Sequence, residues 1–279
     1  DNSDQPGSRY FTGSGIYRDV KLIVRDRLHI ENFHPFITTK GVENGNATLS
    51  VNATIKNDSN SDKAFKILYQ LFDADKRQII SLESEKEIVV SANSETFLSD
   101  EIHVPDAKLW STDNPYLYSL ATTVYTSGGV CDESVVRVGI RTIEYSEENG
   151  FLLNGKKVFM KGVCIHHDNG ALGAASNVHA ERRKLLIMKE MGCNAIRVSH
   201  NPFSDSFLDI CDELGLLVMD EAFDEWRQVQ IIPSLNPIDP RYKMLVHNYY
   251  MDFDEWHKAD LEAMLYRDRN HPSIVMWSI

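Results

Sequence analysis

Three groups of polar and charged residues follow short apolar runs in the second half of this 279-residue chain. The groups are His166-His167-Asp168-Asn169, Arg197-Val198-Ser199-His200-Asn201 and Asp220-Glu221. Imidazole, carboxylate and guanidinium side chains transfer protons, stabilise charge and bind polar ligands. Core packing does not explain three such groups at corresponding positions, so we take them as the candidate functional site.

The elements around these groups predict how they are positioned. The apolar runs are typical of β-strands, and segments with helical spacing of apolar residues separate them. The predicted strands are 157–163, 194–198, 216–219 and 273–277, and the predicted helices are 180–191, 204–214 and 253–267. This alternation predicts a parallel sheet with right-handed crossovers. Because the carboxyl ends of parallel strands meet at one edge, we expect the three polar groups to lie together there.

The length of this second half sets a limit on the fold. A closed barrel of eight strand–helix units needs about 250 residues. The chain from Phe151 to Ile279 is about half that long and stops in the fourth predicted strand. An open half-barrel would leave its last strand unpaired and its apolar core exposed. We therefore expect the chain to be a piece of a longer protein, and its abrupt polar start at Asp1 suggests a missing upstream segment as well.

The first half of the chain has a different pattern. From about residue 20 to 145, apolar and polar residues alternate in short runs, which is typical of half-buried strands. Examples are Leu49-Val51-Ala53-Ile55 and Phe65-Ile67-Tyr69-Leu71. Stretches rich in Asn, Asp, Ser and Gly separate the runs and predict turns. About seven strands in this length predict a β-sandwich of immunoglobulin-like type, although the Cys…Trp…Cys core of antibody domains is absent.

Composition and charge exclude several classes of protein. The chain has 29 basic and 41 acidic residues and a net charge of −12, which argues against a nucleic-acid or anionic-membrane partner. The sequence contains no apolar run long enough for a transmembrane helix, and its polar start shows no signal peptide. Four widely spaced cysteines without a Cys-x-x-Cys pair make a disulfide framework or a structural zinc site unlikely.

Five stretches, in this order along the chain, carry a resemblance to a known family. They are Gly13–Val20, Leu109–Tyr118, Phe151–Val163, Asn194–Pro202 and Arg267–Ile279. Together they resemble glycoside hydrolase family 2, the β-galactosidase and β-glucuronidase family. The resemblance implies a multi-domain β plus α/β fold. Its parts would be the tail of a jelly-roll sugar-binding domain at 1–29, an immunoglobulin-like β-sandwich at 30–145 and the first half of a (β/α)₈ TIM barrel at 146–279.

The resemblance also implies an activity, that of a retaining exo-β-glycosidase that hydrolyses terminal β-linked sugars. β-Galactosidase is the expected activity, and β-glucuronidase is the alternative. Retaining glycosidases need two carboxylates about 5–5.5 Å apart. By the family's second signature, the acid/base Glu would fall three residues after Ile279, and the nucleophile lies further on. We therefore expect no catalytic residue within the chain and no activity from the chain alone.

The resemblance assigns supporting roles to residues that the chain does contain. His166, His200, Asn201 and Glu225 would bind the substrate, and Arg197, Asp168, Asp220 and Glu221 would support the site. Arg197 would keep the nucleophile ionised, because a fixed cation lowers the pKa of a carboxylate. A structural ion pair of Arg197 with Asp220 or Glu221 is the alternative, as is a strand-capping role for either histidine.

Glu225 also matches a Mg²⁺ ligand of the best-known β-galactosidases. The histidine that would be its fellow ligand is Arg227 here, and a guanidinium cannot bind a cation. We therefore expect no cofactor, with a magnesium ion at Glu225 as the alternative. The partners implied are an oligosaccharide or glycoside substrate and a possible second copy of the chain, in a periplasmic or secreted bacterial protein.

Other features leave further interpretations open. Arg9 aligns with an aspartate that enters the family's site; it would suit a carboxylated or sulfated sugar, and a solvent-facing position is the alternative. Tyr249, Tyr250, Phe253 and Trp256 could stack on a sugar or pack in a core. A metal-dependent barrel hydrolase would use His166, Asp168 and His200 as ligands. A non-catalytic carbohydrate-binding protein is the alternative from another class.

Overall fold

The computed structural model describes residues 16–224, 226 and 249–279, and the chain divides into two compact units. The sandwich unit comprises Lys21–Phe159 and Arg269–Pro272. The parallel-sheet unit comprises Met160–Asp268, Ser273–Ile279 and the described residues up to Val20. None of the described helices is both long and apolar enough to cross a membrane.

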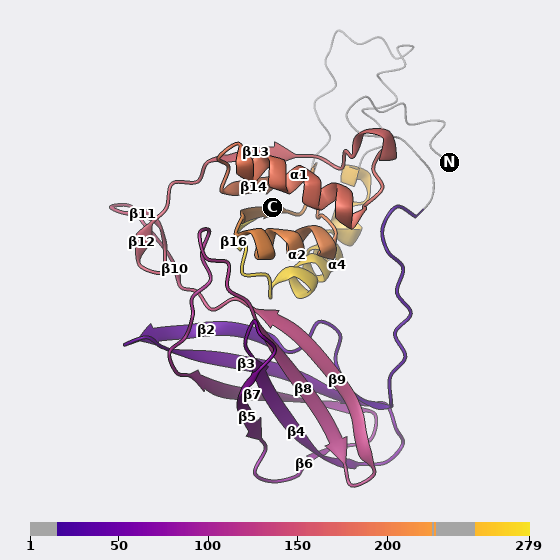
Figure 1. The fold of residues 1–279 in the computed structure, drawn as a ribbon. Helices are drawn as coiled ribbons and strands as arrows, with labels where there is room; N and C mark the ends of the chain where they lie inside the picture. The colour runs from indigo at the N-terminus through magenta and orange to yellow at the C-terminus, as the bar shows by residue number, and fades with distance from the viewer. Residues whose placement is uncertain (1–15, 225, 227–248) are drawn as a thin grey trace. The chain divides into compact units, whose positions relative to one another are not determined.

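Two antiparallel sheets form the sandwich unit (Figure 1). One sheet contains β1 (Leu28–Ile30), β2 (Phe36–Glu43), β3 (Asn46–Asn57) and β7 (Ser94–Val104). The other contains β4 (Lys63–Phe72), β5 (Gln78–Glu83), β6 (Ile88–Val90), β8 (Tyr118–Thr126) and β9 (Gly129–Val138). Alternate residues of β3 and β4 are buried in one apolar cluster that draws on both sheets. The period-two pattern of the sequence therefore folds as the β-sandwich that it predicts.

Asn57, the last residue of β3, forms hydrogen bonds with the loops at one end of this sandwich. Its side-chain amide is fully buried and donates to the carbonyl oxygens of Ser61, Val90 and Ser91 at 2.9, 3.3 and 3.0 Å. Its Oδ1 accepts from the backbone N–H of Ser59 at 3.1 Å. A buried polar group that lacks hydrogen-bond partners lowers the stability of the fold. The bonds of Asn57 satisfy its own buried amide and connect β3 to two loop segments.

Replacing Asn57 by Ala is expected to lower the free energy of unfolding by about 3 kcal/mol, because it removes these hydrogen bonds and leaves the buried carbonyl oxygen of Val90 without this donor. Chemical denaturation of the two proteins measures the difference. Asn52→Ala, on the same strand, is the control: its amide makes one long bond, 3.4 Å, to Ser50, and the expected loss is below about 1 kcal/mol. Equal losses for the two variants would contradict the role given to Asn57.

A small antiparallel sheet completes the sandwich unit and corrects one predicted strand. It contains β10 (Ile143–Ser146), β11 (Gly150–Leu153) and β12 (Lys156–Lys157). The apolar run 157–163 was expected as a single strand, but only its first residue pairs here, and the next strand begins at Gly162. A tight turn at Asn154 and Gly155, with φ angles of 52° and 72°, pairs Lys156 and Lys157 with β11.

The segment Arg269–Pro272 belongs to the sandwich unit although its neighbours in sequence on both sides do not. Asn270 accepts from the N–H of Ile37 at 3.0 Å and donates to the carbonyl oxygen of Pro35 at 2.9 Å. Arg141 donates to the carbonyl oxygen of Pro272. A Cβ on Gly139 would lie 2.5 Å from the Pro272 ring, so this position needs glycine for close packing.

The parallel-sheet unit contains four parallel strands in chain order, β13 (Gly162–Ile165), β14 (Ala195–Val198), β15 (Leu217–Glu221) and β16 (Ile274–Ser278). Among the described residues of this unit, the helices are α1 (Val178–Glu190), α2 (Asp205–Leu214) and α4 (Phe253–Asp268), with 3₁₀ turns η1 (Gly170–Leu172) and η2 (Tyr249–Met251) (Figure 1). This β-α-β-α-β-α-β order is the one predicted; the first strand begins five residues later than expected, and the ends of the other elements are shifted by at most two residues.

Local signals explain where these helices begin and end. The Asn177 side chain accepts from the N–H groups of His179 and Ala180 at the start of α1, and Ser204 accepts from Phe207 at the start of α2. Gly215 ends α2 in the left-handed conformation, with φ 68°. Buried residues of α1 and α2 pack with the strands in one apolar cluster. The helices thereby fix the strands whose ends carry the polar groups.

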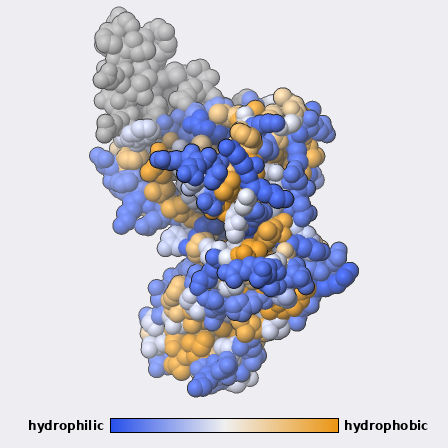
Figure 2. Space-filling view, turned by 90° about the vertical axis from the view of Figure 1, so that its left-hand side faces the viewer, coloured by the Kyte–Doolittle hydropathy of each residue, from blue (hydrophilic) through white to orange (hydrophobic). Residues whose placement is uncertain are grey.

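Hydrophobic residues also appear on the surface, where they form small areas between hydrophilic ones (Figure 2). In the sandwich unit, exposed apolar side chains include Val89, Phe97, Val130 and Val135. Scattered apolar side chains are normal on a soluble protein's surface. These residues therefore do not by themselves define a binding site.

Candidate active site

The carboxyl ends of three neighbouring strands bring four of the eight predicted site residues together. His166 directly follows β13, Arg197 lies in β14 with His200 two residues beyond its end, and Glu221 is the last residue of β15. The strands pair in parallel, so these ends lie at the same edge. The peptide bond between Ser199 and His200 is cis.

Arg197, Glu221 and His200 form a hydrogen-bonded cluster at this edge. Arg197 Nη2 donates to Glu221 Oε1 at 2.9 Å and lies 2.7 Å from Oε2. His200 Nδ1 lies 3.0 Å from Glu221 Oε1. Of the two partners that sequence left open for Arg197, the structure therefore selects Glu221.

The two charged side chains of this cluster are buried to different extents. The Glu221 side chain is 7% exposed, whereas that of Arg197 is 37% exposed. Contacts with the Cys164 thiol and with Glu221 raise the pKa of Arg197 above its ordinary value. A buried carboxylate of this kind depends on its partners, because an unpaired charge away from water is strongly destabilising. The guanidinium, in turn, presents an exposed portion to any ligand at the strand ends.

His166 lies against the cluster, and Asp168 does not take part in it. The His166 and His200 rings meet edge to face with their centroids 5.3 Å apart. Asp168 is exposed, and its carboxylate accepts from the N–H of Gly170 at 3.0 Å. Asp168 therefore caps the turn that leads into η1.

Asp220 is adjacent to Glu221 in sequence but belongs to a different set of contacts. It is fully buried and interacts with Asp268, at the end of α4. Arg267 binds Asp268 with two bonds of 2.6 Å. Burial and the neighbouring Asp268 carboxylate raise the pKa of Asp220 to about 7. The structure thus separates Asp220 from the Arg197–Glu221–His200 cluster.

Asn201 contacts His167, a residue of the first polar group to which the sequence analysis gave no individual role. His167 Nε2 lies 2.6 Å from Asn201 Oδ1, and the His167 ring stacks on Phe203 with centroids 4.0 Å apart. Burial, reinforced by the nearby Arg18 cation, lowers the pKa of His167 to about 4. The two consecutive histidines follow the end of β13, and only His166 lies beside His200.

Other predicted residues lie outside this edge or outside the described part of the chain. Glu225, Arg9 and Arg227 are not among the described residues. Phe253 packs against Phe223, with centroids 5.2 Å apart, and so has the core role that was one of its two interpretations. Trp256 is 50% exposed. The side chain of Tyr250 is not described.

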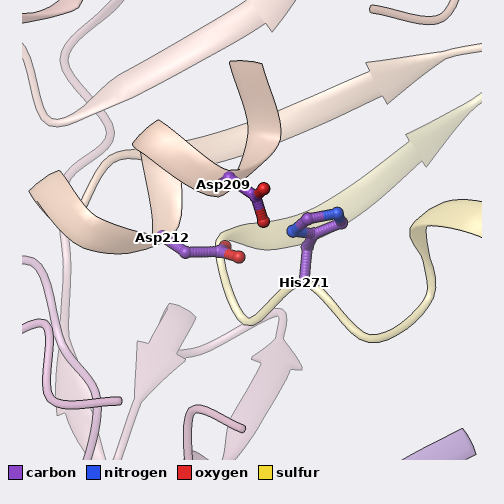
Figure 3. A group of neighbouring side chains, drawn as sticks. All are labelled: Asp209, Asp212 and His271. Carbon is purple, nitrogen blue, oxygen red and sulfur yellow. The ribbon is translucent and has the colours of Figure 1, made fainter. Parts of the chain in front are cut away.

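A further set of ionisable side chains was not selected from the sequence. Asp209 and Asp212 project from neighbouring turns of α2, and His271 lies on the segment that precedes β16 (Figure 3). Asp212 is buried, and its Oδ1 accepts from the N–H of Ser273 at 3.0 Å. Asp212 therefore anchors the start of β16, which is a structural role.

A parallel sheet with helices between its strands and ionisable groups at its carboxyl edge has the design of a barrel-type α/β enzyme. Sequence comparison specifies the family. The chain belongs to glycosyl hydrolases family 2: the model of that family matches residues 28–141, and the model of its TIM barrel domain matches residues 145–279.

Individual relatives agree with this family. The chain is 41% identical over 279 residues to beta-galactosidase BoGH2A of Bacteroides ovatus, covering all of this chain and 31% of that protein. A crystal structure of a glycosyl hydrolase family 2 member from Bacteroides cellulosilyticus superimposes with a TM-score of 0.87 at 38% identity, covering 96% of this chain and 33% of that one. The Bacteroides uniformis beta-glucuronidase structure matches with a TM-score of 0.73 at 30% identity, covering 91% and 29%.

These comparisons confirm the family resemblance and the order of an immunoglobulin-like sandwich followed by TIM-barrel strands. The chain spans about a third of the length of the first of these relatives. The predicted jelly-roll tail at 1–29 and the exact domain boundaries at 29 and 145 stay predictions.

Proposed function

We propose that the protein containing this chain is a retaining exo-β-glycosidase that hydrolyses terminal β-linked sugars, with a β-galactoside as its substrate. The Arg197–Glu221–His200 cluster at the carboxyl edge of the sheet carries this proposal, because it places a cation and an imidazole where a barrel enzyme binds its substrate. The 41% identity to a beta-galactosidase favours galactose. A β-glucuronide is the alternative, supported by the likeness to a beta-glucuronidase structure.

The residues of this chain would bind and orient the sugar. His166, His200 and Asn201 offer hydrogen-bonding groups to its hydroxyls, and Arg197 would lower the pKa of a nearby carboxylate so that it stays ionised. Glu221 supports Arg197 and His200. We assign Asp220 to the support of α4 and Asp168 to the support of the η1 turn. The two reacting carboxylates would come from the remainder of the barrel, the acid/base Glu three residues after Ile279.

The remaining properties are proposals of the same kind. We propose that the enzyme acts without a metal cofactor, because Arg227 stands where a histidine ligand would be needed beside Glu225. Activity that survives dialysis against EDTA is the expected result, and activity restored only by Mg²⁺ would favour the alternative. We propose that the enzyme binds a glycoside and forms a homo-oligomer. We also propose that it is a periplasmic or secreted bacterial protein.

The test uses the protein extended through the whole barrel, assayed against nitrophenyl β-glycosides. We expect cleavage of the β-galactoside, abolished by Gln in place of the Glu expected three residues after Ile279. Cleavage of the β-glucuronide alone would establish the alternative sugar. A folded protein that binds glycosides but cleaves none would favour a carbohydrate-binding protein.

A further inference from the structure

The contacts of Glu221 restrict where the proton on the His200 ring can lie. Glu221 Oε1 is an acceptor when ionised, and it lies 3.0 Å from His200 Nδ1. A hydrogen bond at this distance needs a proton between the two atoms, and only the imidazole can supply it. The contact therefore requires a proton on Nδ1, and the Arg197 cation 3.2 Å from that nitrogen disfavours a second proton on the ring.

Arg197 offers the one competing arrangement. Its Nη2 lies 3.2 Å from His200 Nδ1 and could donate to a bare nitrogen there. That arrangement would put the Nδ1 lone pair against the Glu221 carboxylate with no proton between them. The same Nη2 lies 2.9 Å from Oε1 and 2.7 Å from Oε2. Charge-assisted bonds to a carboxylate are the stronger ones, and a bare Nδ1 would face the Glu221 carboxylate 3.0 Å away, so the arrangement with the proton on Nδ1 is favoured.

Strands hold two of the three side chains, and contacts with them hold the third. Glu221 is buried on β15, in register with Ser278 of β16. Arg197 is on β14, in register with Met219 of β15. The His166 ring supports the His200 ring edge to face. Hydrogen-bonding groups fixed by a sheet and by neighbouring rings position a ligand more accurately than groups on a free loop.

We propose that Glu221 is a positioning residue that fixes the tautomer of His200, so that His200 Nε2 is a hydrogen-bond acceptor for a hydroxyl of the substrate. The tautomer follows from the contacts of this chain. The hydroxyl as ligand rests on the proposed function. An acceptor at Nε2 selects for a sugar that carries an O–H at that point, and against an analogue that lacks it.

Neutron crystallography of the extended protein and of its Glu221→Gln variant tests the tautomer without any assay of activity. We expect deuterium on Nδ1 and none on Nε2 of His200 in the unsubstituted protein. In Glu221→Gln, Arg197 is expected to take the amide oxygen, and the amide NH₂ then donates to Nδ1, so the deuterium moves to Nε2. Deuterium on Nε2 or on both nitrogens of the unsubstituted protein, or no change in the variant, would overturn the proposal.

Kinetics with single-deoxy substrates test the ligand. For one hydroxyl position, the ratio of kcat/KM between the intact glycoside and its deoxy analogue is expected to fall about tenfold in both His200→Ala and Glu221→Gln. A general loss of activity cancels in this ratio, so a purely structural role of Glu221 would leave it unchanged. Glu213→Gln is the matched control, because it removes a carboxylate that pairs with Arg182 on the helices, and its ratio should not change.

The two experiments separate the two proposals. If the extended protein cleaves no glycoside, the proposed function fails, and the neutron structures still decide the position of the proton. If it cleaves a glycoside and no deoxy position shows the shared effect, the role of His200 Nε2 as an acceptor for a substrate hydroxyl is wrong.

Discussion

Replacing Arg197 by Ala in the extended protein is expected to lower kcat at least a hundredfold and to destabilise the fold at the same time. The rate falls because a fixed cation at the carboxyl edge is lost, and removing one such electrostatic group typically costs about 10²–10³ in kcat. The fold is weakened because Glu221, 7% exposed, loses the partner 2.7 Å from its Oε2. The carboxylate left behind is buried but the lost guanidinium is 37% exposed, so the expected loss is about 2 kcal/mol, less than that of a fully buried pair.

Steady-state kinetics and thermal unfolding of the same preparations measure the two effects. Arg197→Lys is the informative control, since lysine keeps the charge but lacks the planar fork that reaches Glu221 and Cys164 together. We expect it to recover most of the stability and only part of kcat. An Arg197→Ala protein with unchanged kcat and an unchanged unfolding temperature would show that the cluster has neither role.

Replacing Asp220 by Asn is expected to change how stability depends on pH. The native pKa of Asp220 is raised from 3.8 to about 7 by burial and by Asp268. Between these values the folded protein holds a proton that the unfolded chain releases. Its contribution to stability is therefore fully present below about pH 4, falls by up to about 1.4 kcal/mol per pH unit, and is lost above about pH 7.

Asn cannot ionise, and its amide can donate to the Asp268 carboxylate, so Asp220→Asn removes this decline. Unfolding free energies at pH 5 and pH 8 measure the effect, and the gain of the variant over the unsubstituted protein should be larger at pH 8. Asp168→Asn, at an exposed position, controls for a change in net charge. Parallel pH curves for the Asp220→Asn and unsubstituted proteins would mean that Asp220 is ionised in both states.

The sequence was sufficient to predict which elements form and which of their ends meet, because both follow from local spacing. The alternation along β3 and the caps of α1 and α2 are signals within a few residues of the structure that they produce. The convergence of His166, Arg197 and Glu221 then follows from the parallel pairing of the strands. None of these steps needs knowledge of long-range packing.

The partner of each side chain required more than spacing. Whether Arg197 pairs with Asp220 or Glu221 depends on which face each carboxylate takes, and β15 has a register shift between Val218 and Met219. A shift of one residue exchanges the two faces of a strand. The stacking of His167 on Phe203 likewise joins residues far apart in sequence. Neither contact can be predicted from the residues that are nearby in the sequence.

The path of the chain through Arg269–Pro272 limits how this protein can be divided or recombined. Asn270 supplies a hydrogen-bond acceptor to Ile37 and a donor to Pro35, yet it lies more than a hundred residues after the rest of the sandwich unit. A fragment that stops at Phe159 would therefore lack part of its own unit. Exchanging sandwiches between family members would require these four residues to be exchanged with them, as a second graft inside the barrel sequence.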